Sequence, residues 1–576
     1  MIKPEPALNI PEIIKTDLNQ TIITLYKLKD IQDKIRITLP KDINFADYTS
    51  NIAFIIAKDL KTNPKTLAEN LAKNFKSQII TKTEAVNGYL NFWLNHNTYL
   101  KTLKLGIKNK LFRQQNKTVV CEFGQPNTHK AVHIGHLYSY IFGSALSNLI
   151  EVCGIKVKRV NYQGDIGPHI AKCLYGVINN IKEYNRLLKQ PKTEKVITER
   201  GLFLQNCYSN ANKLYEENPK IRDEINELNK KIYDNYNEIK AIYETTRNWS
   251  LEYINILEKK LNINFDKYYF ESQTHAKGKE IVKKNITTIF GEDAGAVIFR
   301  GEKYGLHTRV FINRYGLPTY EAKDLGLIYM KVKDFNPDLI IITTAKEQTE
   351  YFKVVFKTAE LIFPKLKNKL VHIGFGMVNL KTGKMSSRLN NIISAFDVIN
   401  ETEKIIKQKY DTENRTTKIL ANSAIKFSFL NSESEKDVFF DLEKSISKEG
   451  KSGPYLLYSL VRAKSILKKA NIIDSKIIDN LDNNYNKLTN EEKLFIRKLF
   501  LYFEVLKNAF ESYSVHQLTQ YLFETAQQFN QNYQKISVIN TNDLEQKKAR
   551  LGLTLIYKNI LESGLNILGI ETVEKL

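Results

Sequence analysis

Residues 118–136 read TVVCEFGQPNTHKAVHIGH, which joins a short apolar run to two closely spaced histidines. The β-branched residues of 118–123 predict a buried strand, and the turn-forming residues after them end it. From His136 onward apolar residues recur at helical spacing, and Gly154 marks the predicted end of that helix. Residues 155–162 alternate in polarity as a second strand would. The stretch therefore predicts a strand–helix–strand unit of the nucleotide-binding kind.

The two histidines stand at the predicted start of this helix. A helix N-terminus attracts phosphate through its free N–H groups and the positive end of its dipole. Gly135 has no side chain, so a ligand ring can approach the backbone there. His133 and His136 can donate hydrogen bonds to charge that develops on a phosphate during its transfer. The alternative is a pair of ordinary histidines. No cysteine or acidic set accompanies them at zinc spacing, so we expect no metal site.

A second motif lies far along the chain, where residues 384–388 read KMSSR. Residues 371–378 predict a strand, and a polar loop with a glycine before the motif follows. Lys384 is a point charge suited to the β- and γ-phosphates of a nucleotide, and Arg388 can add a bidentate contact. Taken alone, this motif could be a solvated basic loop. Together, the two motifs could surround a nucleoside triphosphate from two sides.

The two motifs resemble the signatures of the class I aminoacyl-tRNA synthetases, and the chain is most similar to the arginyl family of that class. The class carries a His-Ile-Gly-His stretch and a Lys-Met-Ser-Lys-Ser-like loop. Arginyl enzymes often carry a further lysine just upstream of the histidines, where Lys130 lies here. The resemblance implies four catalytic residues, namely His133, His136, Lys384 and Lys130. It implies ATP contacts from Gly135, Met377, Val378, Ser386, Ser387 and Arg388.

Two further segments carry the resemblance to the arginyl family. Residues 122–127 are similar to the family's Glu-Phe-Ser-Ser-Pro-Asn stretch, and residues 316–324 are similar to its Gly-x-Pro-x-Tyr-x-x-x-Asp segment. Tyr320 and Asp324 share one face of a predicted helix, where a phenol and a carboxylate suit a guanidinium. A local surface contact is the alternative for this pair. The arginine-binding residues that the resemblance implies are Glu122, Asn127, Tyr320, Asp324 and Gln348.

The resemblance covers nearly the whole chain and divides it into three parts. Residues 1–108 resemble an α+β N-terminal domain that in the family contacts the tRNA elbow; a docking domain without RNA contact is the alternative. Residues 109–439 are expected to form an α/β, Rossmann-like catalytic domain with a charged helical insertion near 180–275. Residues 440–576 predict an all-α anticodon-binding bundle. Near its start, Tyr455 and Tyr458 could stack on unpaired tRNA bases, or they could pack in the bundle core.

Composition agrees with a nucleic-acid partner. The 576-residue chain has a net charge of +23 and a pI near 9.4, which favours a polyanion such as tRNA, although a general lysine bias is the alternative. The four cysteines show no C-x-x-C spacing and indicate reduced thiols. No apolar run is long enough for a membrane span, and the first residues lack a signal-peptide core, so we expect a cytoplasmic protein without membrane contact.

The resemblance implies ATP-dependent ligation of L-arginine to tRNA(Arg). The arginine carboxylate would attack the α-phosphate of ATP, and pyrophosphate would leave with Mg2+ shielding its charge. Arginine would then pass from the adenylate to the terminal adenosine of the tRNA. By analogy with relatives we expect a monomer. Three alternatives stay open: a class I synthetase for another amino acid, with lysine the nearest rival; a tRNA-binding protein without catalysis; and a nucleotidylyltransferase of the same superfamily.

Overall fold

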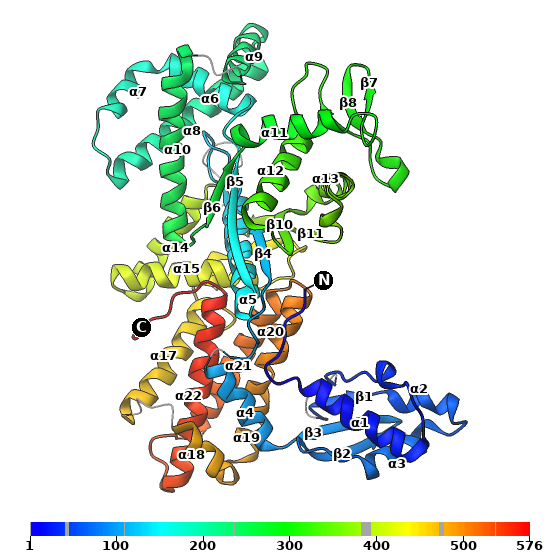
Figure 1. Ribbon diagram of the computed structural model, residues 1–576. Coiled ribbons are helices and arrows are strands. Elements are labelled where there is room, and N and C mark those ends of the chain that lie inside the picture. The colour runs from blue at the N-terminus through cyan, green and yellow to red at the C-terminus, as the bar shows by residue number, and fades with distance from the viewer. Residues whose placement is uncertain are drawn as a thin grey trace.

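The molecule is elongated, with a parallel sheet in its upper half, a helical bundle below it and a small N-terminal domain projecting sideways (Figure 1). The computed structural model describes residues 2–40, 45–108, 110–233, 237–381, 393–471, 477–535 and 537–576. No helix among these residues is long and apolar enough to cross a membrane.

The N-terminal domain is an antiparallel three-stranded sheet, in the order β1-β3-β2, covered by helices. The first helix buries Ile10, Ile14, Leu18 and Ile22, which recur every four residues. The elements are α1 (Ile10–Tyr26), β1 (Tyr48–Ser50), α2 (Ile52–Asp59), α3 (Pro64–Asn74), β2 (Ile80–Val86) and β3 (Tyr89–Leu94). The next helix, α4 (His96–Ile107), falls within the range 1–108 but packs against helices of the C-terminal bundle.

A five-stranded parallel sheet in the order β11-β10-β4-β5-β6 forms the catalytic core. Its strands are β4 (Thr118–Glu122), β5 (Lys156–Gln163), β6 (Lys267–Phe270), β10 (Leu339–Ala345) and β11 (Leu370–Phe375). The chain adds strands to one side of β4 and then returns to the other side, so a topological switch point lies between β4 and β10. Ligands of such sheets bind beyond the carboxyl ends of the strands at this point.

The predicted strand–helix–strand unit is confirmed. The helix between β4 and β5 is α5 (Ile134–Val152), which starts one residue after His133 and ends just before Gly154. Thirteen of its residues are buried, so both of its faces pack against other elements. The histidines therefore stand at the N-terminus of a helix whose position is fixed by the core.

The helical insertion is also confirmed, although its limits differ from the predicted 180–275. It consists of α6 (Pro168–Asn179), α7 (Ile181–Leu188), α8 (Glu194–Glu217), α9 (Pro219–Tyr233) and α10 (Asn237–Lys260). The prediction of helix is wrong for β6, a short strand that pairs with β5 at the edge of the sheet. A second insertion follows α11 (Glu271–Lys284) as a small antiparallel sheet. Its strands are β7 (Gly291–Asp293), β8 (Ala296–Phe299) and β9 (Arg309–Ile312).

The single strand predicted for 371–378 is two strands. The first is β11, and the second is β12 (Val378–Leu380), which leaves the main sheet to pair in parallel with β13 (Val438–Phe440). The break falls at Gly376, whose N–H donates to the Ser434 carbonyl at 2.8 Å. A Cβ at Gly376 would lie 2.4 Å from the Lys436 carbonyl oxygen, so only glycine permits this close approach.

The predicted all-helical C-terminal part is confirmed for the described residues from α16 onward. Two helices, α14 (Ala395–Tyr410) and α15 (Asn414–Leu430), connect it to the catalytic domain. The bundle contains α16 (Leu442–Ser445), α17 (Gly453–Lys469), α18 (Ile477–Asn483), α19 (Asn490–Phe500), α20 (Tyr502–Glu511), α21 (His516–Lys535) and α22 (Leu544–Ile567).

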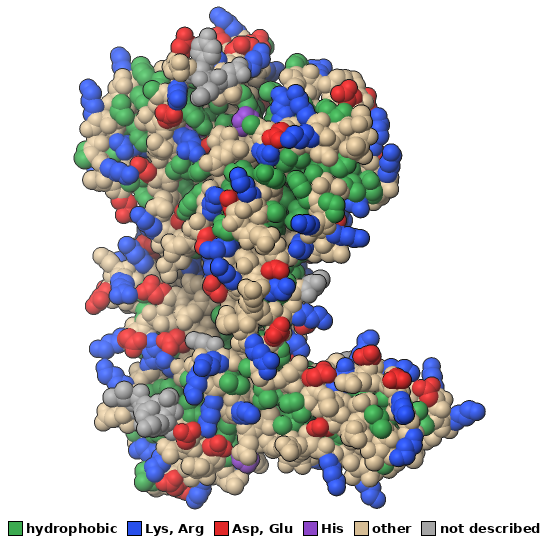
Figure 2. Space-filling view, in the orientation of Figure 1, with side chains coloured by type: hydrophobic (Ala, Val, Ile, Leu, Met, Phe, Trp, Pro, Cys, Tyr) green, Lys and Arg blue, Asp and Glu red, His purple; other side chains and the backbone are tan. Residues whose placement is uncertain are grey.

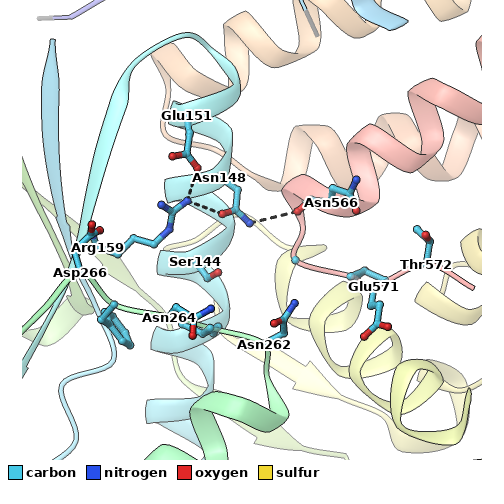
Figure 3. Close-up of a pocket in the computed structure, with 14 residues that line it drawn as sticks. Ser144, Asn148, Glu151, Arg159, Asn262, Asn264, Asp266, Asn566, Glu571 and Thr572 are labelled. Atoms are coloured by element: carbon cyan, nitrogen blue, oxygen red, sulfur yellow. Dashed lines mark hydrogen bonds and ion pairs between the residues drawn. The ribbon is translucent and has the colours of Figure 1, made fainter. Parts of the chain in front are cut away.

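The last turns of α5 touch the end of α22. The Asn148 side chain donates to the backbone carbonyl of Asn566 at 3.3 Å (Figure 3). It also donates to the backbone carbonyl of Ile567 at 3.2 Å. Beside this contact, a polar cavity of about 640 Å3 opens between α5, the loop before β6 and the C-terminal tail. It lies at the opposite end of α5 from the histidines, so it is separate from the nucleotide end of the helix.

Candidate active site

The histidine motif caps α5 with its own side chains. The Gly135 N–H donates to Nδ1 of His133 at 3.1 Å, and the His133 N–H donates to Nδ1 of His136 at 3.2 Å. The two ring centroids lie 3.8 Å apart. Because each Nδ1 accepts a backbone hydrogen bond, each neutral imidazole carries its proton on Nε2. The motif thus presents two Nε2–H donors side by side at a helix N-terminus.

Both imidazoles are neutral at physiological pH. Burial lowers the pKa of His133, and the nearby Lys130 lowers it further. Burial lowers the pKa of His136 well below its ordinary value, and His133 and Lys130 add to the effect. A neutral ring can accept a backbone N–H at Nδ1 and donate its Nε2–H to a phosphate at the same time.

The other two histidines of this region have structural roles. His129 is buried, and its ring nitrogens contact the hydroxyls of Thr128 at 3.0 Å and Thr246 at 2.9 Å. Burial lowers the pKa of His129 to about 3, and burial likewise lowers the pKa of His169 to about 3. These contacts fasten the loop before α5 to helix α10. Lys130 follows in the same loop, with its Nζ 5.0 Å from the ring centroid of Tyr208 on α8.

The second motif lies outside the described residues. The predictions for Lys384, Ser386, Ser387 and Arg388 therefore stay predictions. Its flanks are described. On the far side, the Ile134 N–H donates to the Ile393 carbonyl and the Ala395 N–H donates to the Val132 carbonyl, each at 2.9 Å. Residues 393–395 therefore lie directly beside the histidine motif. On the near side, Met377 is exposed and Val378 is buried in β12.

The predicted arginine-binding residues lie near the switch point of the sheet. Glu122 ends β4, and Gln348 lies exposed in a single 3-10 turn directly after β10. Asn127 lies in the loop after β4, against the next loop of the sheet. A Cβ at Gly164 would be 2.2 Å from the Asn127 Oδ1. Any larger residue at position 164 would therefore clash with the Asn127 side chain.

Asp324 and Tyr320 begin α12 (Tyr320–Phe335). Asp324 accepts a hydrogen bond from the Tyr351 hydroxyl at 2.6 Å. Burial raises the pKa of Asp324 to about 7; the hydrogen bond from Tyr351 opposes the rise, and the charge of Glu122 adds to it. Tyr320 remains 59% exposed at the start of the helix. Because an opposite charge favours the ionised form of a carboxyl group, a cation bound beside the half-buried Asp324 would lower its pKa again.

Three charged residues near Glu122 and Asp324 could not be identified from the sequence. Lys331 on α12 forms a buried ion pair with Glu122. Lys323 pairs with Glu271 at 2.7 Å, and its Nζ lies 5.0 Å from the ring centroid of Tyr320. Lys331 is seven residues after Asp324, which places it on the same helix face and is a weak signal. Glu271 and Lys323 come from separate segments, and nothing in their spacing connects them.

The two tyrosines expected to bind tRNA differ in their surroundings. The Tyr455 hydroxyl accepts a hydrogen bond from Asn530 at 3.0 Å, and its ring packs on Phe523, so it belongs largely to the bundle interior. Tyr458 is 38% exposed, and the guanidinium of Arg462 lies 5.0 Å from its ring centroid. Only Tyr458 offers an open ring for stacking.

Comparisons with known proteins agree with this architecture. Residues 100–441 match the family described as tRNA synthetases class I (R), catalytic domain; residues 456–576 match the DALR anticodon binding domain; and residues 12–94 match the arginyl tRNA synthetase N terminal domain. An arginine–tRNA ligase of Clostridium perfringens is 30% identical over 545 residues, covering 91% of this chain and 93% of that protein. An arginine–tRNA ligase of Borrelia turicatae is 28% identical, and the alignment covers 100% of this chain and 99% of that protein.

Among solved structures, the Thermus thermophilus arginyl-tRNA synthetase has a TM-score of 0.78 at 20% identity. The alignment covers 99% of this chain and 100% of that one, and so shows the shared fold. The matched catalytic model spans more than half of the chain. The chain therefore belongs to the arginyl-tRNA synthetase family of class I, the arginine–tRNA ligases that charge tRNA with arginine in translation.

Proposed function

We propose that His133 and His136 bind the α-phosphate of ATP through their Nε2–H groups. Their Nδ1 atoms are occupied by backbone N–H groups, and no partner for either Nε2 lies among the described residues. Two neutral donors at a helix N-terminus match the negative charge that builds up on the phosphate in the transition state. This pair of oriented donors is the observation that carries the proposal.

The amino acid is assigned to the pocket beside the switch point. Asp324 pairs with the arginine guanidinium, and Tyr320 packs against it. Glu122, Asn127 and Gln348 are assigned to the α-amino group and neighbouring polar atoms. The arginine carboxylate then attacks the α-phosphorus in line, and the bond from that phosphorus to the pyrophosphate oxygen breaks. Positioning and electrostatics suffice, because no protein nucleophile takes part.

The phosphate contacts come from the motifs and their flanks. Lys384, together with Lys130 or Arg388, holds the leaving pyrophosphate. Gly135 is assigned to close approach of the nucleotide, and Met377 and Val378 are assigned to further ATP contacts. Ser386 and Ser387 complete this set. Mg2+ would arrive on the triphosphate and shield the charge of the phosphates.

The tRNA is assigned to the outer parts of the chain. We propose that 1–108 contacts the elbow, that 109–439 activates arginine and receives the acceptor end, and that 440–576 binds the anticodon. Tyr458 is the stacking residue, with Tyr455 supporting it from inside the bundle. We infer a monomer by analogy with the family. A protein that serves translation is also assigned to the cytoplasm.

The histidine assignment is tested by His133→Asn and His136→Asn. Each change should lower kcat for arginine-dependent pyrophosphate exchange, measured with tRNA present, by about a hundredfold or more. The KM for arginine should change little, because neither ring touches that pocket. His516→Asn, in the bundle, is the matched control and should behave as the wild type. Unchanged kcat in both motif variants would overturn the assignment.

A further inference from the structure

Of the four carboxylates around the proposed arginine site, three form ion pairs with a lysine or arginine. All three are glutamates with a cation within ion-pair distance, and in each pair the glutamate and its cation come from two different elements. The pairs are Lys331–Glu122, Lys323–Glu271 and Arg309–Glu321. The fourth carboxylate, Asp324, has a phenol as its partner and no cation within that distance among the described residues.

Lys331 is the most deeply buried of these cations. It is fully buried on α12, and its ammonium contacts one oxygen of Glu122. The other oxygen of Glu122 accepts a hydrogen bond from the Gln125 side chain at 2.8 Å. A buried ammonium is costly unless its charge is compensated, and the carboxylate of Glu122 supplies that compensation for Lys331.

Asp324 lies among groups from four other elements. The titratable groups that face it are Glu122 from β4, Tyr162 from β5, Glu271 from α11, Tyr351 from α13 and Lys331 from its own helix. The four carboxylates of Glu122, Glu271, Glu321 and Asp324 and the three cations of Lys331, Lys323 and Arg309 therefore sum to one formal negative charge. Free arginine carries two positive groups and one carboxylate, which gives it one net positive charge.

We propose that Lys331 is a positioning and specificity-determining residue for arginine, because it compensates Glu122 and leaves Asp324 as the single uncompensated carboxylate of the pocket. The inference rests on the proposed arginine site. The pocket then favours a ligand with one net positive charge over a neutral or doubly charged ligand of the same shape. Lys331 acts through Glu122 and Asp324, and it does not contact the substrate.

Three ligands that differ mainly in charge test this. Citrulline has the shape of arginine but no net charge, arginine has one positive charge, and agmatine, which lacks the carboxylate, has two. Inhibition constants of citrulline and agmatine against arginine are measured in the pyrophosphate exchange reaction with tRNA. Lys331→Met adds one negative charge to the pocket, so the ratio of agmatine inhibition constant to arginine KM should fall by about tenfold or more.

Two further variants keep the test decisive. Lys331→Gln removes the charge but keeps a hydrogen-bond donor for Glu122, and it should shift the ratio in the same direction even if the methionine variant does not fold. Lys331→Arg should keep the wild-type ratio. A purely structural role predicts loss of stability, with the agmatine-to-arginine ratio unchanged in every folded variant, and that result would overturn the inference.

Asp324→Asn separates this inference from the underlying site assignment. If Asp324 pairs with the guanidinium, this variant should lose its preference for arginine over citrulline. If that preference survives, the arginine site itself is wrongly assigned. If the preference is lost but the Lys331 variants keep the wild-type agmatine ratio, only the role of Lys331 is rejected.

Discussion

At the scale of single residues, the protonation of Asp324 links arginine recognition to pH. Burial raises the pKa of this carboxyl to about 7, and Glu122 contributes in the same direction. A guanidinium bound beside it would lower that pKa again, because an opposite charge favours the ionised form. Arginine binding should therefore release a proton from Asp324 when the pH is below about 7.

The sign of the pH dependence follows from this release. Above about pH 7 Asp324 is already ionised, and the KM for arginine should be constant. Below it the carboxyl must lose a proton before it pairs, so the KM should rise by up to about tenfold per pH unit. The measurement is the KM for arginine between pH 6 and 8, with the KM for ATP as internal reference. An arginine KM that stays level across this range would speak against Asp324 as the partner.

At the scale of elements, a buried lysine holds the C-terminal tail against the catalytic domain. Lys426 on α15 donates to the Leu261 carbonyl at 2.7 Å and to the Gly569 carbonyl at 2.5 Å. Burial lowers the pKa of this lysine to about 8, so it is still mainly protonated at neutral pH. The loop after α10 and the tail after α22 thus share one cation.

Lys426→Met should destabilise the protein, because two buried carbonyls lose their donor. We expect the free energy of unfolding to fall by about 2 kcal/mol. Lys418→Met, at an exposed position of the same helix, is the matched control and should stay within about 0.5 kcal/mol of the wild type. Chemical unfolding of the three proteins decides the matter; equal stabilities would mean that Lys426 does not anchor the tail.

The elements also show what the sequence could and could not predict. The unit β4–α5–β5 was predictable because its periodicity is strong and its histidines mark the helix start. The short strand β6 was not, because Lys267 to Phe270 carry no apolar alternation and follow a long charged helix. The split at Gly376 depends on pairing with β13, which lies far away in the sequence. Lys331 and Lys323 could not be identified for the same reason, because their partners Glu122 and Glu271 lie far from them in the sequence.

At the scale of the whole molecule, a buried aspartate joins the N-terminal domain to the bundle. Asp47 accepts hydrogen bonds from the Leu94 N–H at 2.8 Å and the Tyr99 hydroxyl at 2.5 Å, and it pairs with Arg497 of α19 at 2.9 Å. Beside it, the Tyr48 hydroxyl donates to Glu504 of α20 at 2.6 Å. The projecting domain in Figure 1 is thereby fixed to helices that are assigned to the anticodon.

Asp47→Asn should loosen this junction. Breaking one partner of a buried ion pair costs about 3 kcal/mol of stability, and the KM for tRNA should rise while the KM for ATP stays unchanged. Asp59→Asn, at an exposed pair with Lys34, is the control. Steady-state charging assays at several tRNA concentrations test this. A tRNA KM equal to that of the wild type would show that the junction does not position the tRNA.

The positive charge of the chain is not gathered into one patch on the face seen in Figure 2, where lysines and arginines alternate with acidic side chains.

The arginine pocket is tested most directly by Asp324→Asn in tRNA charging. We expect kcat/KM for arginine to fall by about a thousandfold, since the guanidinium loses its charged partner in a buried site, while the KM for ATP stays within a few fold. Asp334→Asn on the same helix is the matched control and should keep nearly full activity. An Asp324→Asn variant that charges tRNA with wild-type kcat/KM for arginine would contradict the assignment of this pocket.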